Sequence, residues 1–575
     1  MERCLIVEDR RDNLHHRLMI ALLKADLADL LIAAVKKAGF QSGRASEAPA
    51  GIAWEYPVDP AFGDLSTTLA FGLAKVLRRK PREIAERIAA SVDVPHDMVE
   101  RVEVAGAGYL NFILAKGFWR GVVRQILLAG PAWGRADIGN GLKVLVEFVS
   151  ANPTGPLVVV NARAAAVGDA IARLMEAVGY SAYREYYVND AGNQFRNLAL
   201  AMEVRCRQLL GEDCPMPEEA YPGDYVIDMA REFLERHGQE ALAAPEPERR
   251  DRLGRFAVER ILAWQQAALE AYGVTFDNWF SERALRERGD PEQAIEALRA
   301  RGHLYEREGA LWFRSTAFGD DKDRVLVKGD GESTYFLPDI AYHQDKLARG
   351  FELLIDLWGP DHHGYVARMQ AAMQALGHPP DALRILIVQL VRLMRGNEQI
   401  RMSKRTGQFV TMDELVGEVG RDAARFIFLT RRCDSPLDFD LEMAKAASDE
   451  NPVYYVQYAH TRLCSVLREA AKADVAAPSP EDDLEPLDLP EEVGLIKQLA
   501  LYPELVIGAA QALEPHRLTA YLHDLAARFH GYYNRHRIIS TDTSLTGARL
   551  ALVAACRVVI GNALNLLGVS APERM

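Results

Sequence analysis

The first residues with evident chemical potential lie in a turn rich in proline and glycine, 150–161, which follows a short apolar run, 142–149. A strand that enters a helix through such a turn is where parallel α/β sheets bind nucleotides, because free amides at the helix N-terminus face the phosphates. An ordinary strand-to-helix connection would look the same. A nucleotide site is therefore a hypothesis, with the candidate residues Ala151, Asn152, Pro153, Thr154, Gly155, Pro156, Leu157, Val158, Val159, Val160 and Asn161.

A second candidate is the segment Met402-Ser403-Lys404, which lies close to Gly407. A lysine flanked by a serine and a glycine on a loop can clamp a triphosphate and offset charge as pyrophosphate leaves. The tripeptide is common, so it carries little weight alone.

A third candidate follows the apolar run 351–358 and contains Asp361, His362 and His363. These residue types bind zinc, but the side chains of two adjacent histidines point apart on most backbones. Hydrogen bonding to a nucleotide or an amino acid is the favoured interpretation, and we predict no metal site.

The elements that must position these residues follow from periodicity. The run 142–149 predicts a buried strand, 162–178 a helix and 183–188 the next strand, which together form a βαβ unit and indicate a parallel sheet. Further strands are expected at 351–358 and 385–390, after a helix-rich insertion at about 195–320.

The flanking segments have different patterns. Residues 1–20 are polar and are treated as an extension, and 21–130 predict a compact α+β module with helices at 21–35 and 65–77. Residues 131–440 then form the parallel-sheet domain, and 441–575 are helical, interrupted by a segment at 481–492 with seven acids and no base. That acidic segment is expected to be a solvated loop.

Composition limits the function. The 575 residues carry a net charge of −13, which argues against a protein that coats nucleic acid through bulk positive charge. Six cysteines without a Cys-x-x-Cys pair favour free thiols in a reducing compartment, so we expect a cytoplasmic protein. The most apolar stretch, 550–569, is interrupted by Arg557 and two asparagines, which predicts a buried helix and not a membrane span.

Order and spacing make the motifs specific. The sequence resembles the arginyl-tRNA synthetases, a family of the class I aminoacyl-tRNA synthetases, over about residues 20–575. The motifs that carry the resemblance are VEFVSANPTGP from residue 146, YYVNDAGNQ from 186, TYFLPDIAYH from 334, WGPDHHGY from 358, MSKRTG from 402, DAAR from 422, SPLDFD from 435, NPVYYVQYAH from 451, and the ending GN…LLGVSAPERM, residues 561–575.

The resemblance implies a multidomain α/β plus α protein. A Rossmann-type parallel-sheet catalytic domain would stand between an N-terminal α+β module that touches the tRNA elbow and a C-terminal all-α anticodon-binding domain. The enzyme would form arginyl-adenylate from L-arginine and ATP with Mg²⁺, then pass the arginyl group to the 2′-hydroxyl of the terminal adenosine of tRNA-Arg. Activation in this family usually also needs bound tRNA, and its members are usually monomeric.

Site residues follow from the same resemblance. Glu147 and Asp339 would take the guanidinium group, a planar fork of five donors, beside Tyr335; a helix cap is the alternative role of Asp339. Ser150 and Asn152 would hold the α-amino and carboxylate groups, and His362 or Gln389 would assist. For the tRNA, the resemblance indicates Asn111 and Phe112 at the elbow, and Tyr454, Tyr455, Tyr458, Arg462 and Met575 near the anticodon. The tyrosines could instead belong to the core.

One departure matters. Members of the class carry His-x-Gly-His where this sequence has Val158-Val159-Val160-Asn161, so both histidines and the glycine are absent. Either Asn161, the helix N-terminus, Lys404 and magnesium carry the phosphate work, or the protein is a degenerate paralogue that binds tRNA without charging it. The retained Met402-Ser403-Lys404 favours an active enzyme. A synthetase for cysteine would want a zinc site, and one for glutamate would want cations where Glu147 and Asp339 lie.

Overall fold

The computed structural model describes residues 19–40, 51–396, 398–400 and 410–575. Its centre is a five-stranded parallel sheet with the order β12 (Leu383–Ile387), β11 (Leu353–Trp358), β5 (Lys143–Glu147), β6 (Ser181–Val188), β7 (Asn278–Ser281). The chain winds outward in both directions from the boundary between β5 and β11. Doubly wound sheets bind their ligands at the carboxyl edge beside such a boundary, and the prediction of a Rossmann-type sheet is confirmed.

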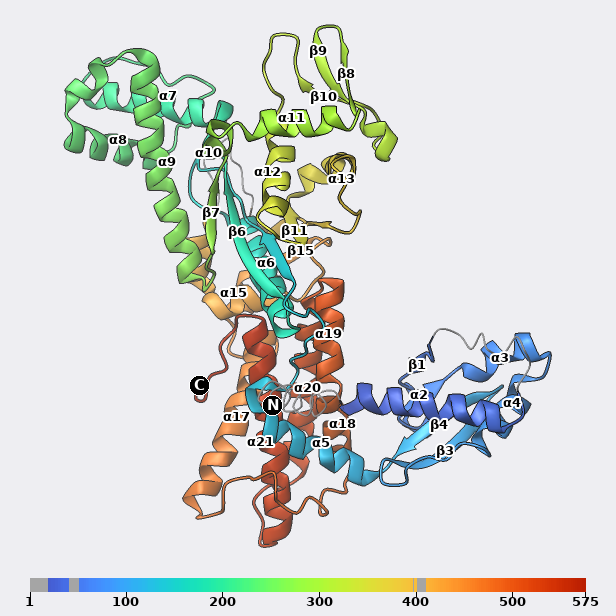
Figure 1. Cartoon of the computed structure of the whole chain (residues 1–575). Helices are drawn as coiled ribbons and strands as arrows, with labels where there is room; N and C mark the ends of the chain where they lie inside the picture. Colours follow the sequence, from blue (N-terminus) through green and yellow to red (C-terminus); the bar gives the residue numbers. More distant parts are fainter. Residues whose placement is uncertain (1–18, 41–50, 397, 401–409) are drawn as a thin grey trace, which may run out of the picture.

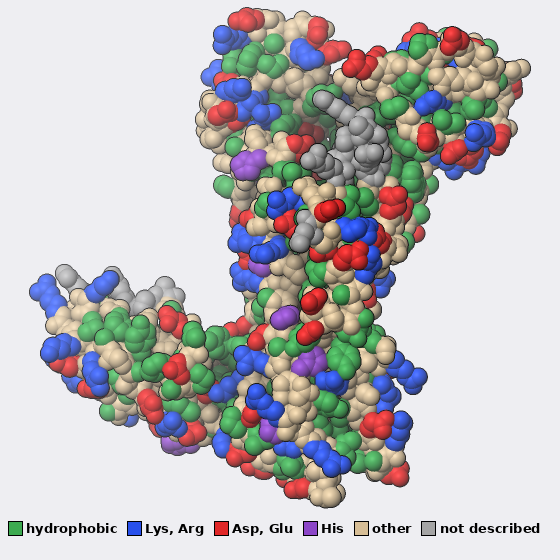
Figure 2. Space-filling model, turned by 180° about the vertical axis from the view of Figure 1, so that it is seen from behind, with side chains coloured by type: hydrophobic (Ala, Val, Ile, Leu, Met, Phe, Trp, Pro, Cys, Tyr) green, Lys and Arg blue, Asp and Glu red, His purple; other side chains and the backbone are tan. Residues whose placement is uncertain are grey.

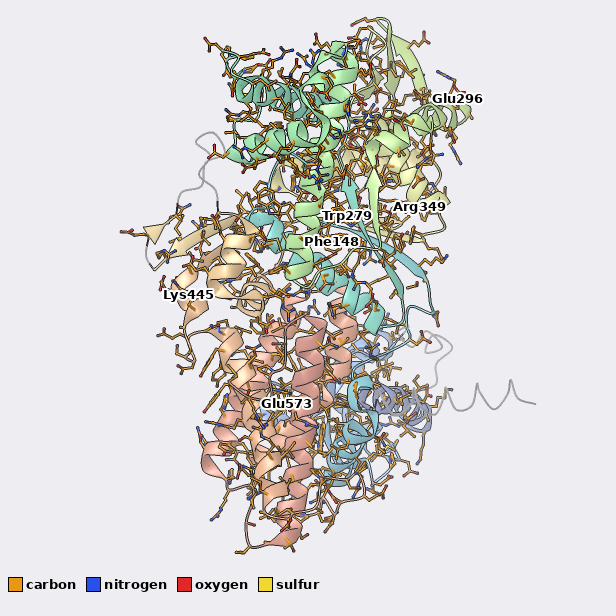
Figure 3. The ribbon with its side chains drawn as sticks, turned by 90° about the vertical axis from the view of Figure 1, so that its left-hand side faces the viewer. Phe148, Trp279, Glu296, Arg349, Lys445 and Glu573 are labelled. Carbon is orange, nitrogen blue, oxygen red and sulfur yellow. The ribbon has the colours of Figure 1, made fainter. Side chains whose placement is uncertain are left out.

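Helix α6 (Val159–Ala177) is packed against this sheet and confirms the predicted βαβ unit (Figure 1). It begins three residues earlier than predicted. Its alanine-rich surface lies so close to the sheet that a Cβ on Gly168 would come within 2.2 Å of the Phe148 ring. Phe148, which follows β5, and Trp279 of β7 (both labelled in Figure 3) pack against Phe276, with ring centroids 4.5 and 5.5 Å apart.

The insertion predicted at 195–320 is more varied than a set of helices. Helices α7 (Gly192–Leu209), α8 (Asp224–His237) and α9 (Glu246–Ala271) form a subdomain with its own core. The chain then returns to the central sheet as β7 before α10 (Glu282–Glu287) and α11 (Asp290–Ala300). A small antiparallel sheet follows, β8 (Leu304–Arg307), β9 (Ala310–Phe313) and β10 (Arg324–Val327). Four-residue strands are too short to show a period, which explains why they were missed.

The N-terminal module projects from the body of the molecule (Figure 1). Helices α2 (Met19–Lys37), α3 (Leu69–Leu77) and α4 (Pro81–Ala89) accompany an antiparallel sheet of β1 (Trp54–Glu55), β2 (Leu65–Thr67), β4 (Tyr109–Leu114) and β3 (Val99–Ala105). The α+β prediction is confirmed, but residues 65–67 are a strand and not the first turn of a helix. Helix α5 (Lys116–Ala129) falls within the range 21–130 predicted for this module, but it contacts α18 (Pro490–Ala500) and α21 (Thr543–Leu566) of the C-terminal domain.

The C-terminal domain is a bundle of α17 (Pro452–Lys472), α18 (Pro490–Ala500), α19 (Tyr502–Ala512), α20 (His516–Arg535) and α21 (Thr543–Leu566). The stretches Pro490–Ala512 and Thr543–Leu566 are long and apolar enough to cross a membrane by length and composition. In the most apolar window of α21, 67% of the residues are buried inside the protein, so the prediction of a buried helix is confirmed.

The acidic segment 481–492 lies between the two flanking modules, and the prediction that it is simply solvated is wrong. Leu484 and Leu487 are each only 1% exposed. Arg120 of α5 donates to the Glu485 carboxylate at 2.7 Å and to the Glu485 carbonyl at 2.8 Å, and Lys116 pairs with Asp488. The segment is therefore docked on α5 by buried leucines and ion pairs.

Candidate active site

A cavity of about 720 Å³ opens at the carboxyl ends of β5, β6 and β11, beneath α12 (Phe336–Ala348) and the turn 360–365. Its size falls within the range of small-molecule sites, about 300–1,000 Å³. Six of the seven predicted arginine-binding residues line it: Glu147, Ser150, Asn152, Tyr335, Asp339 and His362.

Asp339 lies in the first turns of α12 and opens onto the cavity. Its Oδ2 accepts a hydrogen bond from the Tyr365 hydroxyl at 2.8 Å. Burial raises the pKa of Asp339 to about 7; Tyr365 and His343 oppose the shift, whereas Glu282 adds to it. Since α12 begins at Phe336 and Tyr335 is its N-cap, Asp339 is not the helix cap.

Glu147 ends β5 and is held from two sides. Its Oε1 accepts from Ser150 Oγ at 2.9 Å, and its Oε2 accepts from Lys346 Nζ at 2.6 Å. Ser150 Oγ also accepts the Tyr187 amide at 3.1 Å. This geometry depends on positive φ angles at Val149 (68°) and Ser150 (37°), which non-glycine residues rarely adopt. Strain of this kind typically gathers at functional sites.

Three lining residues were missed by sequence reasoning. Glu282, at the start of α10, is a further carboxylate, and its Oε1 accepts from Arg286 Nε at 2.8 Å. The Tyr187 hydroxyl and Gln194 Oε1 are buried and have no hydrogen-bond partner among the described residues. Tyr187 and Gln194 belong to a family motif that gave no role for them, and nothing in the local sequence distinguishes Glu282.

The backbone of the turn 150–161 is held by hydrogen bonds from the insertion and from β6. Gln265 of α9 donates to the Gly155 carbonyl at 2.9 Å, Tyr225 of α8 donates to the Thr154 carbonyl, and Tyr186 of β6 donates to the Ala151 carbonyl at 3.0 Å. These bonds fix the backbone at the β5 end of the turn, ahead of α6.

At the start of α6, Asn161 Oδ1 accepts from the Val158 amide at 2.9 Å, which leaves the Asn161 amide nitrogen as a donor. Val158 also pairs with Thr411, and the Met412 amide donates to the Leu157 carbonyl at 2.8 Å. Met402, Ser403 and Lys404 lie outside the described residues, but the chain that follows them returns beside this turn.

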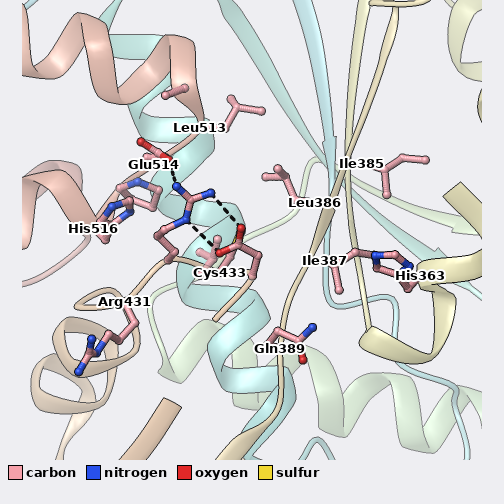
Figure 4. Close-up of a pocket in the computed structure, with 15 residues that line it drawn as sticks. His363, Ile385, Leu386, Ile387, Gln389, Arg431, Cys433, Leu513, Glu514 and His516 are labelled. Carbon is pink, nitrogen blue, oxygen red and sulfur yellow. Dashed lines mark hydrogen bonds and ion pairs between the residues drawn. The ribbon is translucent and has the colours of Figure 1, made fainter. Parts of the chain in front are cut away.

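The structure does not bring Gln389 together with the other six. Gln389 lines a separate cavity of about 340 Å³, which lies between β12 and the connection of α19 to α20 (Figure 4). The backbone carbonyl of Gln389 accepts from Arg163 at 2.9 Å, and its backbone N–H donates to the Cys433 carbonyl at 2.8 Å. His363 lines this second cavity, whereas its neighbour His362 faces the first, as expected of adjacent histidines.

On α17, the residues Tyr454, Tyr458 and Arg462 are spaced four apart and share one face of the helix. The rings of Tyr454 and Tyr458 stack with centroids 6.0 Å apart, and Arg462 donates to the Tyr458 hydroxyl at 2.8 Å. Tyr455 instead packs against His523 and His530. Met575 is 56% exposed.

At the N-terminal module, the prediction that Asn111 and Phe112 contact RNA is wrong. Both lie on the central strand β4, where they are 3% and 0% exposed. Ser66 donates to Asn111 Oδ1 at 2.7 Å, and Trp54 packs edge-on against Phe112. Both side chains therefore make their contacts inside the module.

Within residues 19–40, 51–396, 398–400 and 410–575, no three His, Cys, Asp or Glu side chains are grouped to hold a metal ion. His362 Nε2 and Asp361 Oδ2 are 3.6 Å apart.

Known proteins match this chain over nearly its whole length. Three family models match: an arginyl tRNA synthetase N-terminal domain at 25–114, a tRNA synthetases class I (R) catalytic domain at 122–221 and 260–440, and a DALR anticodon binding domain at 456–575.

Similar relatives include the arginine–tRNA ligase of Syntrophotalea carbinolica, 51% identical over 91% of this chain and 94% of the relative. The arginine–tRNA ligase of Desulforudis audaxviator is 50% identical over 97% of this chain and 100% of the relative. The solved arginyl-tRNA synthetase of Thermus thermophilus has a TM-score of 0.74 at 25% identity and covers 96% of this chain and 100% of that one.

Proposed function

Because the chain belongs to the arginyl-tRNA synthetase family and is an arginine–tRNA ligase, we propose that the cavity at the carboxyl edge of the sheet is its arginine site. The observation that carries this assignment is the convergence of Glu147, Asp339 and Glu282 on one cavity. Carboxylates arranged around a single space suit a guanidinium, which presents five donors and no acceptor.

Within the cavity, Asp339 is the main partner of the guanidinium, with Glu282 and Glu147 beside it and Tyr335 at the mouth. Gln194 Oε1 is an acceptor without a partner in the described structure, which suits an N–H group of the substrate. Ser150 and Asn152, on the turn after β5, hold the α-amino and carboxylate groups. The arginine carboxylate is thereby directed toward the start of α6, where the ATP phosphates bind.

ATP is the second substrate, as in other class I synthetases, and we propose that Mg²⁺ enters bound to its phosphates. The amides of the first turn of α6, the Asn161 side chain and Lys404 replace the missing histidines as phosphate donors. The bonds from Gln265, Tyr225 and Tyr186 keep the preceding turn ordered, which supports an active site and not a decayed one.

Two transfers follow from this arrangement. An arginine carboxylate oxygen attacks the α-phosphorus of ATP, so that arginyl-adenylate forms and pyrophosphate leaves. The 2′-hydroxyl of the terminal adenosine of tRNA-Arg then attacks the activated carbonyl carbon, so that the ester forms and AMP leaves with the bonding electrons.

For the tRNA, we propose two contact surfaces. Tyr454, Tyr458 and Arg462 present stacking groups to unpaired anticodon bases, with Met575 nearby. At the outer end of the N-terminal module, where Figure 2 shows Lys and Arg side chains, a basic tip takes the role predicted for Asn111 and Phe112. The tip consists of the exposed residues Lys75, Arg78, Arg79, Lys80 and Arg82, with Tyr109 on the same module.

The protein is also proposed to act as a monomer in the cytoplasm, without a membrane partner. Its two most apolar helical stretches belong to the C-terminal bundle, and half or more of each is buried there.

The test is charging by the purified full chain with tRNA-Arg, ATP and Mg²⁺. We expect tRNA-dependent attachment of arginine and no attachment of citrulline, in which a neutral urea replaces the guanidinium. Exchange of pyrophosphate into ATP, with and without tRNA, reports the first step separately. Binding of tRNA without either activity would instead identify a degenerate paralogue.

A further inference from the structure

A buried group of four ionisable side chains lies directly behind the cavity. Lys346, on α12, is 0% exposed, and its Nζ contacts Glu147 Oε2 at 2.6 Å and both oxygens of Asp356 at 2.9 and 3.0 Å. His343, one turn earlier on the same helix, contacts Asp356 Oδ2 through Nε2 at 2.7 Å. Of these four residues, Glu147 and His343 line the cavity, whereas Lys346 and Asp356 lie behind it.

His343 is held between two polar groups. Its Nδ1 lies 2.7 Å from the Asp339 carbonyl, and its Nε2 lies 2.7 Å from Asp356 Oδ2. Lys346 and His343 therefore meet Asp356 from the same helix, and Lys346 also meets Glu147.

Lys346 acts on the two acids to different extents. Burial alone would raise the pKa of Asp356, but Lys346 and His343 outweigh it and lower that pKa to about 2. Burial also raises the pKa of Glu147, and here Lys346 opposes the shift without cancelling it. Without an adjacent cation, a buried carboxylate takes up a proton.

We propose that Lys346 is a positioning residue for arginine recognition, which keeps Glu147 ionised and fixed at the edge of the cavity. Lys346 does not touch the substrate and acts only through Glu147. The inference rests on the proposed arginine site and adds a requirement for it: the acidity of the cavity depends on a cation held behind it. Groups that face Glu147 from the packed elements are Lys346, His343, Tyr342 and Asp339 on α12, Asp356 on β11 and Tyr187 on β6.

Calorimetric titration of free arginine into the full chain tests this directly. For Lys346→Met at pH 7, we expect the arginine Kd to rise roughly 10- to 100-fold, the size expected when a charge-assisted contact is lost. Because the lost affinity reflects protonation of Glu147, the Kd of the variant should fall again between pH 8 and 9.5. The wild-type Kd should show no such fall. Because the α-amino group of arginine loses its proton in the same range, the quantity compared is the ratio of the variant Kd to the wild-type Kd at each pH.

A compensating change sharpens the test. In the double variant Lys346→Met/Asp356→Asn, one negative charge beside Glu147 is removed together with the positive one, so arginine affinity should partly return. Lys346→Gln keeps a donor but no charge and should behave like Lys346→Met; it also serves if the methionine variant does not fold. A purely structural role would predict neither the rescue nor the pH dependence.

Arg349→Met is the matched control. Arg349 is the C-cap residue of the same helix and donates two hydrogen bonds of 2.6 and 2.7 Å to Glu185, but it does not line the cavity. We expect it to lower the unfolding midpoint and leave the arginine Kd unchanged. Folded Lys346 variants with a wild-type Kd, or with a Kd raised equally at every pH, would overturn the proposal. A wild-type chain that does not charge tRNA would instead refute the proposed function.

Discussion

The Tyr365 hydroxyl donates a 2.8 Å hydrogen bond to Asp339 Oδ2 and fixes the carboxylate that faces the proposed guanidinium position. Tyr365 comes from the turn after β11, and Asp339 comes from α12, so the bond joins the two walls of the cavity. A buried carboxylate with a raised pKa is costly to ionise, and a substrate cation repays that cost only when it binds.

Asp339→Asn should therefore separate stability from function. The amide keeps an oxygen for Tyr365 but removes the charge, so arginine binding should be lost while tRNA affinity stays nearly unchanged. Since the pKa of Asp339 is raised on folding, ionisation destabilises the free protein above the unfolded pKa. The variant should unfold at a higher temperature than wild type at pH 8. A lower midpoint, or a normal arginine KM, would contradict the role assigned to Asp339.

Arginine binding should depend on pH for the same reason. With a pKa of about 7 in the free protein, Asp339 is roughly three-quarters protonated at pH 6.5. Arginine binds the ionised form, so its affinity should fall as the pH falls through 7. Titrations in buffers of different ionisation enthalpy should show release of most of one proton at pH 6.5 and almost none at pH 8.5. Equal proton release at both values would exclude this coupling.

On α17, Tyr458→Ala should weaken tRNA binding and leave arginine affinity unchanged. Stacking of a base on an aromatic ring contributes about 1–3 kcal/mol, so the tRNA Kd should rise roughly 5- to 150-fold. Tyr455→Leu is the control, because Tyr455 packs inward against His523 and His530. It should reduce stability with little change in tRNA affinity, and the reverse pattern would place the RNA on another face.

The basic tip predicts a salt effect. The triple variant Arg78→Ala/Arg79→Ala/Lys80→Ala should weaken tRNA binding. The slope of log Kd against log salt should fall by about 1 for each of these basic side chains that contacts a phosphate. Arg299→Ala is the control: it removes an exposed basic side chain that is already paired with Glu296, and it should change neither the tRNA Kd nor the salt slope. An unchanged slope in the triple variant would show that the tip does not meet the tRNA.

The docking of the acidic segment should depend on its leucines more than on its surface charges. Leu487 is 1% exposed, and truncation of a buried leucine to alanine costs about 2–5 kcal/mol. Lys116 and Asp488 are both largely exposed, and exposed pairs contribute little. Leu487→Ala should lower the unfolding midpoint clearly, whereas Lys116→Ala should leave it nearly unchanged. A comparable loss in both variants would show that charge holds the segment.

Sequence alone predicts the parts of the fold that are long and locally patterned. The apolar run of β5, the alanine-rich α6 and the period of α17 each predict their element. The four-residue β7 has no such pattern, and Leu65–Thr67 is too short to show a period and is followed almost directly by an apolar helix.

The residues of the candidate site also differ in whether the sequence predicts them. Six of the residues predicted to bind arginine lie in motifs, and they line one cavity. Glu282 and Lys346 could not be predicted, because Lys346 meets Glu147 across 199 residues and Glu282 begins a short polar helix. The burial of Asn111 and Phe112 depends on the strands β2 and β3 that flank β4, which a local motif does not reveal.

The acidic segment 481–492 also determines which basic side chains of the protein a polyanion can reach. By binding Lys116 and Arg120, it occupies cations that would otherwise attract phosphate backbones, as an RNA strand would. It thus acts as an internal competitor for nonspecific nucleic acid on that side of the molecule. In the tip, Arg82 is paired with Glu86, but Lys75, Arg78, Arg79 and Lys80 have no acidic partner among the described residues, and neither has Arg462. We therefore expect the tRNA to meet these unpaired basic residues despite the negative net charge of the chain.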